Sequence, residues 1–183
     1  MIDVAIVLIV LAYAALGWFG GVIRRVIGFV ALYLAFLGAT QTAPTAANVI
    51  LQAKPDWTVS NALIAGFFLI FGALLLVVEL LAAISHRRLQ LATIAFDRPS
   101  GLALGVVTAV AGLSITIFLL AGAAQPDAGS PDGAQIEIGD AIRHSLFAPV
   151  LKTVERPSRV VFGAAIPVAP NVFFSGQEAR FEH

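Results

Sequence analysis

Four long stretches of the chain contain no charged residue, and this feature limits the possible folds more than any other. Counted between consecutive charged residues, the stretches cover 4–23, 26–53, 57–78 and 99–126. A helix needs about 20 apolar residues to cross the hydrocarbon core of a bilayer, where charged side chains are costly. Each stretch is long enough for one crossing. The sequence therefore predicts an all-α integral membrane protein built as a four-helix bundle.

The composition argues against a water-soluble protein. Hydrophobic residues make up 59% of the chain and charged residues 12%, whereas soluble domains are roughly half apolar and a quarter charged. Eleven basic and eleven acidic residues give a net charge of zero, so we expect a lipid bilayer and no nucleic acid as partner. The chain has no cysteine, which excludes thiolate catalysis, disulfides and zinc–thiolate sites.

Glycine, proline and charged residues mark the ends of the expected helices. We predict a transmembrane domain over 1–125, with helices at about 2–19, 26–42, 60–85 and 100–124. The pair Gly20-Gly21 provides a tight turn after the first helix. Pro44 and Pro55 predict a loop over 43–59, which could include a short interfacial helix. The first helix is expected to be retained, because no basic segment precedes it as in a secretory signal peptide.

Basic residues predict the orientation, because short cytoplasmic loops are rich in Lys and Arg. The loops after the first and third helices hold Arg24, Arg25, Arg87, Arg88 and Arg98. The middle loop holds Lys54 alone. We therefore expect both termini on the extracytoplasmic side.

Residues 126–183 are expected to form an extramembrane tail. Apolar residues recur at spacing four and predict an amphipathic helix over about 138–156, which Pro149 kinks or splits. The apolar segment 160–174 is too short and too rich in proline to span. Either it lies extended on the bilayer surface, where Phe162, Phe173 and Phe174 would insert, or it packs on the tail helix or on a partner.

Glu79 is a candidate intramembrane functional carboxylate, because an acidic residue inside a spanning helix often handles protons or cations. In that interpretation the protein is a small transporter or channel component, with polar groups facing a pore: Thr108, Ser114 and Thr116. The structural alternative is that Glu79 pairs with an arginine such as Arg98.

Two further sets of residues are candidates for interactions. Four arginines could bind anionic lipid or a cytoplasmic partner, or serve only to set topology: Arg24, Arg25, Arg87 and Arg88. Small residues form stripes that allow close helix packing inside the bundle or in a homo-oligomer. These are Gly101, Gly105, Ala109 and Gly112 in the fourth helix, and Gly28, Ala31, Ala35 and Ala39 in the second.

Signatures of enzymes are missing from the sequence. His86, His144 and His183 form no H-E-x-x-H motif. Neither a G-x-S-x-G nucleophile motif nor a G-x-x-x-x-G-K-[ST] phosphate loop occurs. We therefore predict no catalytic residue, no metal site and no cofactor.

Two short motifs and their places in the four-helix plan resemble the colicin V production protein family of bacterial inner-membrane proteins. The first is an early acidic residue, Asp3, followed by Gly17, Gly21 and Arg24. The second is Asp97, Arg98, Gly101 and Gly105. A weaker similarity is Ser145 followed by an apolar helix. The resemblance covers about 1–125 and extends weakly to about 155. Arg25 departs from the family pattern, because the family usually has an acidic residue at this position.

The resemblance implies a multi-pass protein of the inner membrane that acts in toxin production or export, or in envelope homeostasis. We expect a non-enzymatic scaffold or accessory protein with an unknown partner in the membrane or on its extracytoplasmic side. A similar four-helix unit anchors certain periplasmic serine proteases, but the tail here is too short for a protease domain.

Overall fold

The computed structural model describes residues 2–86, 97–125 and 133–175, and all regular structure in these ranges is helical. Three long apolar helices form the body: α1 (Ile2–Ala53), α2 (Val59–His86) and α3 (Asp97–Ala123). Four short helices follow in the tail: α4 (Gly133–Arg143), α5 (Ala148–Thr153), α6 (Glu155–Phe162) and α7 (Pro170–Ser175). All three long helices have the length and apolar composition needed to cross a membrane.

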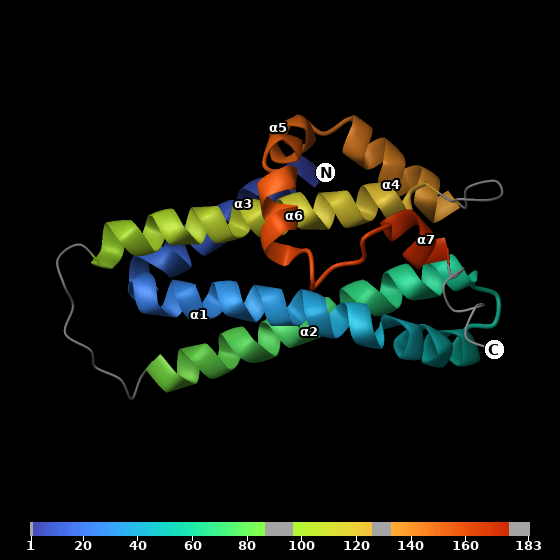
Figure 1. Ribbon diagram of the computed structural model, residues 1–183, viewed down its shortest axis with the longest axis horizontal. Helices are drawn as coiled ribbons and strands as arrows, with labels where there is room; N and C mark the ends of the chain where they lie inside the picture. Colours follow the sequence, from blue (N-terminus) through green and yellow to red (C-terminus); the bar gives the residue numbers. More distant parts are fainter. Residues whose placement is uncertain (1, 87–96, 126–132, 176–183) are drawn as a thin grey trace.

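Helix α1 reverses direction at Gly21, so that it consists of a first arm (2–20) and a second arm (22–53). Gly17 of the first arm lies against Gly101 of α3, and Tyr13 lies against Gly105, so these two segments run antiparallel. Leu32 of the second arm lies against Gly112, so the second arm runs parallel to α3. The two arms are therefore antiparallel, as Figure 1 shows at the left end of the molecule.

The glycine turn is tighter than the sequence predicts. Gly21 has φ 69° and ψ −178°, which breaks the helix at a single residue. Positive φ is easily reached only by glycine. Arg24 and Arg25, which were expected in the turn, already belong to the second arm.

The predicted loop over 43–59 is wrong, because the second arm continues through Pro44 to Ala53. A proline inside a helix costs about 3 kcal/mol. Ala43 and Ala47 lie in close contact with Gly66 of α2, and this packing holds the segment helical. Pro44 itself is on the exposed face, and only 54–58 form the connection to α2.

The core lies where the second arm, α2 and α3 meet. Phe36 of the second arm stacks on Phe71 of α2 with ring centroids 4.5 Å apart. Small residues on the second arm allow the approach, and they are all buried: Gly28, Ala31, Ala35, Ala39, Ala43 and Ala47. In lipid, such close packing is a main source of helix association.

The tail differs from the single helix predicted over 138–156. It forms α4, a break at 144–147, α5 and α6. Pro149, in the first turn of α5, begins the new helix after the break, so the predicted split at this proline is confirmed. In Figure 1, α4 runs back along α3, and α6 crosses α3 near the middle of its length.

Segment 160–174 does not insert its phenylalanines into lipid. Phe162 and Phe174 are fully buried in the protein. Phe162 contacts the rings of Phe29 and Phe36 at 5.4 and 5.6 Å, and Phe174 contacts the ring of Phe67 at 5.6 Å. The segment therefore packs on the long helices α1 and α2, which was not among the expected locations.

Candidate functional site

The glycines of the two sequence motifs meet at one helix crossing. A Cβ atom added to Gly17 would overlap the backbone carbonyl of Gly101, and a Cβ added to Gly105 would overlap the carbonyl of Tyr13. A Cβ on Gly101 would lie 2.9 Å from the Cα and carbonyl carbon of Gly21. All of these neighbours are backbone atoms, which no side-chain rotation can move away. The first arm and α3 therefore touch backbone to backbone, and the motif glycines permit this contact.

The small-residue stripes serve packing within the chain. Gly101 and Gly105 are covered by the first arm, and Gly112 by Leu32. Ala109 is buried as well. With these faces occupied inside one molecule, they are not free surfaces for a homo-oligomer.

Arg24 of the first motif folds over the turn. Its side-chain carbons lie so close to Gly20 that a Cβ there would meet the Arg24 Cδ at 2.6 Å. Gly20 thus makes room for the arginine stem. The arginine and the glycines of this motif form one local structure around the reversal at Gly21.

Arg25 was a candidate either for a basic patch that binds lipid or a partner or for a residue that only sets topology, and it is 0% exposed. Its guanidinium carbon lies 5.4 Å from the centre of the Tyr13 ring on the first arm, a distance typical of cation–π contact. The reversal at Gly21 brings the first arm over this arginine and covers it. A patch that includes Arg25 is therefore not present on the surface.

The remaining predicted residues are only partly described. Arg98 is exposed at the start of α3. Asp97 begins α3 and Glu79 lies in α2, but their side chains, like Arg87 and Arg88, lie outside the described parts of the structure. The proposed pairing of Glu79 with Arg98 thus stays a prediction.

Asp3 and Ser145, both singled out by the family resemblance, are 142 residues apart and form a direct hydrogen bond. The Ser145 hydroxyl donates to Asp3 Oδ1 at 2.5 Å. The backbone N–H groups of Leu146 and Phe147 donate to the same carboxylate at 3.1 and 3.4 Å. The Ser145 hydroxyl oxygen accepts from the N–H of Ala148 at 3.0 Å. We call Asp3 with 145–148 the N-terminal clamp, because it fixes the tail to the first turn of α1.

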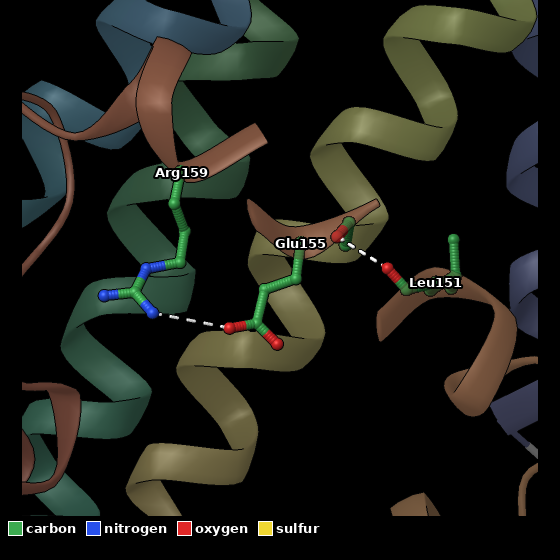
Figure 2. Close-up of polar contacts among 4 residues, drawn as sticks. Leu151, Glu155 and Arg159 are labelled. Atoms are coloured by element: carbon green, nitrogen blue, oxygen red, sulfur yellow. Dashed lines mark hydrogen bonds and ion pairs between the residues drawn. The ribbon is translucent and has the colours of Figure 1, made fainter. Parts of the chain in front are cut away.

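Three more polar side chains fix the tail along the long helices. Ser114 of α3 donates to the carbonyl of Leu151 at 2.9 Å, one of the bonds drawn in Figure 2. Thr40 of the second arm donates to the carbonyl of Ala165 at 2.9 Å. Gln135 of α4 donates to the carbonyl of Ala123 and to the Ser60 hydroxyl, each at 3.0 Å. Together with the buried Phe162, these contacts attach the tail segment from α4 through α6 to the long helices.

The three hydroxyls that were candidates to face a pore all donate to backbone carbonyls. Thr108 donates to the carbonyl of Leu104, and Thr116 to that of Gly112, both within α3. Ser114 holds the tail. Among the described residues, no group of three or more His, Cys, Asp or Glu side chains is placed to bind a metal ion.

Sequence reasoning identified the ends of the clamp but not the contact between them. Asp3 and Ser145 were noted as separate motif elements, and nothing in the spacing of apolar residues joins them. Thr40 and Gln135 carried no signal at all, because single polar residues near helix ends are common.

Comparison with known proteins gives one family match. The model of the colicin V production protein family matches residues 2–156. No curated protein and no solved structure matches the chain. The matched range begins at the first arm and ends in the first turn of α6, so it contains the glycine crossing and the whole N-terminal clamp. The family is not known as an enzyme family. With most of its length matched and three helices able to span a bilayer, the chain is a membrane protein that belongs to the colicin V production protein family.

Proposed function

We propose that the protein crosses the cytoplasmic membrane four times, with both termini on the extracytoplasmic side. The first arm is about 28 Å long at 1.5 Å per residue, close to the roughly 30 Å of the hydrocarbon core. The second arm returns from the turn at Gly21, and α2 and α3 add two crossings. The basic residues Arg24 and Arg98 lie at the same end of the bundle, which supports a cytoplasmic position for that end.

The second arm is longer than one crossing requires. At about 48 Å it exceeds the hydrocarbon core by roughly 18 Å. The surplus, together with the first turns of α2, lies at the end where α4 and α7 pack, as Gln135 with Ser60 and Phe174 with Phe67 indicate. In the proposed orientation this end forms a small extracytoplasmic head.

We further propose that the head is the working part of the protein, a non-enzymatic scaffold that holds a partner during toxin or protein export or envelope maintenance. The observation that carries this proposal is the N-terminal clamp. A carboxylate at the start of the chain fixes the tail in one position on the outer end of the bundle. A fixed tail presents a defined surface, as a scaffold requires.

The test is complementation in a bacterium from which the gene has been deleted, with export of a peptide toxin and sensitivity to detergent as readouts. We expect Asp3→Ala combined with Ser145→Ala to impair complementation while the protein remains at normal abundance in the membrane. We expect Glu79→Gln to complement fully. The opposite result, in which Glu79→Gln fails at normal abundance and the clamp variant complements, would support a transporter and refute the scaffold.

A further inference from the structure

Two arginines of α6 and a group of exposed apolar residues near them have no role in the proposed scaffold. Arg156 and Arg159 line an open recess of about 340 Å³, together with Val160, Ile166, Pro167 and Val168. Val160 is 86% and Val168 83% exposed, although neighbouring Phe162 and Ala165 are fully buried. The lining thus combines cationic and apolar side chains, which match the charged head group and the acyl chains of a lipid molecule.

In the four-crossing placement, contacts with the long helices give the depth of this recess. Phe162 contacts Phe29 and Phe36 of the second arm. Leu32, which lies between these two residues, contacts Gly112 of α3, about 21 Å along α3 from Arg98 at 1.5 Å per residue. Phe29 and Phe36 are thus about 16 and 27 Å from the level of Arg98, within the outer half of the roughly 30 Å hydrocarbon core. The C-terminal end of α6 therefore lies at the depth of the outer leaflet.

Arg159 lies at a different depth from Phe162. Its guanidinium carbon is 4.3 Å from the centre of the Phe118 ring, and Phe118 is about 30 Å along α3 from Arg98. This is the level of the outer head groups. Helix α6 thus places its arginine at the membrane surface and its last apolar turn inside the leaflet, the arrangement expected of an interfacial helix.

The charges around the recess favour an anion. Glu155 is the acidic neighbour of Arg159 on α6, and their contact is long at 3.5 Å (Figure 2). The Arg159 side chain keeps 42% of its surface exposed. Arg156 is exposed, and the basic Lys152 lies one turn earlier on α5. Two guanidinium groups and one partly engaged carboxylate leave a net positive charge, which suits a phosphate group.

We propose that this recess binds an anionic phospholipid of the outer leaflet, with the phosphate between Arg156 and Arg159 and an acyl chain along Val160 and Val168. The bound lipid covers the exposed apolar residues of the tail and anchors the clamped tail at the membrane surface. The proposal rests on the four-crossing placement and adds a ligand class to it.

Insertion is tested by fluorescence quenching in vesicles of phosphatidylethanolamine and phosphatidylglycerol with brominated acyl chains. Single tryptophans are placed by Val160→Trp and by Leu8→Trp in a chain whose Trp18 and Trp57 are replaced by Phe. We expect quenching at both positions. Quenching at position 8 but not at position 160 would refute only the insertion of the tail and leave the membrane placement intact. Position 8 lies on the exposed face of the first arm. Absence of quenching there would refute the membrane placement itself.

Phosphate recognition is tested by native mass spectrometry of the purified full-length protein with added phosphatidylglycerol. We expect retention of this lipid to fall about fivefold for each arginine lost in Arg156→Gln and Arg159→Gln. Arg143→Gln, at an exposed basic residue of α4 that does not line the recess, is the matched control and should change retention less than about twofold. Arg156→Lys with Arg159→Lys should restore part of the binding.

Two outcomes would overturn the assignment. If millimolar inorganic phosphate displaced the lipid as well as phosphatidylglycerol itself does, the recess would be a site for free anions. If the double Gln variant, with a melting temperature equal to that of the wild type, retained phosphatidylglycerol normally, the arginines would not bind the head group. In that case the exposed valines would belong to a protein interface.

Discussion

The contact between the first arm and α3 gives the sharpest prediction. In Gly101→Ala, the new Cβ would lie 2.9 Å from the Cα and carbonyl carbon of Gly21 and closer still to the carbonyl oxygen of Gly17, whereas ordinary contact begins at 3.4 Å. The two helices would have to separate by at least the difference, about 0.5 Å, along a rigid backbone. Overpacking of this kind costs about 1–3 kcal/mol.

Gly72→Ala is the matched control, because a Cβ on Gly72 of α2 would have no neighbour within 4 Å. Alanine favours a helix over glycine by about 1 kcal/mol, so the control should be neutral or slightly more stable. At roughly 2–4 °C per kcal/mol for a chain of this size, a cost of about 2 kcal/mol lowers the melting temperature of Gly101→Ala by about 4–8 °C.

The assay is thermal unfolding in detergent, followed by the fluorescence of Trp18 and Trp57. The cost at Gly101 and the gain at Gly72 have opposite signs, so the two variants should separate clearly. Equal melting temperatures for Gly101→Ala and Gly72→Ala would show that the helices are not in backbone contact at this crossing. The proposed role of the motif glycines would then be wrong.

The other predictions concern the attachment of the tail. Asp3→Asn and Ser145→Ala should each lower the melting temperature. The double variant should lower it by clearly less than the sum of the two single effects, because both substitutions break one network with a coupling of about 1–3 kcal/mol. Additive effects would contradict the clamp, and Asp140→Asn at an exposed position of α4 is the control. Thr40→Val should speed protease cleavage of the tail about fivefold, through the loss of one hydrogen bond of about 1 kcal/mol. Thr42→Val is the control and should not change the rate, because the Thr42 hydroxyl donates to Gly38 within its own helix. Equal cleavage rates in the two variants would show that the bond to Ala165 does not hold the tail. Phe162→Ala should destabilise by about 3–5 kcal/mol in denaturant unfolding, and an effect no larger than that of the exposed Phe147→Ala would mean that this ring is not in the core.

The long helices of the body were predictable from the sequence, because the positions of charges limit where a chain can lie in lipid. The predicted ends of the helix at 60–85 agree with α2 to within one residue. The prediction failed at Pro44, where local propensity indicates a loop but contacts of Ala43 and Ala47 with Gly66 keep the helix intact. Such contacts join residues far apart in sequence and cannot be read from a local pattern.

The candidate site was only half predictable for the same reason. The motif glycines were found, and small residues four apart predict a close helix approach; which helix approaches which follows only from the structure. Arg25 shows the limit most clearly. Its position among basic residues indicates the surface, but the reversal at Gly21 buries it beside Tyr13.

The most direct test of the four-crossing arrangement is the location of the N-terminus relative to the tail. The cysteine-free chain allows single cysteines in a tag ahead of Met1, at Glu137 on α4 and at Arg98 at the start of α3. In intact cells treated with a membrane-impermeant maleimide, we expect labelling of the tag and of position 137, and labelling of position 98 only after permeabilisation. Labelling of the tag and of position 137 from opposite sides would mean that α1 crosses the membrane once, which would contradict the reversal at Gly21 and the clamp between Asp3 and Ser145.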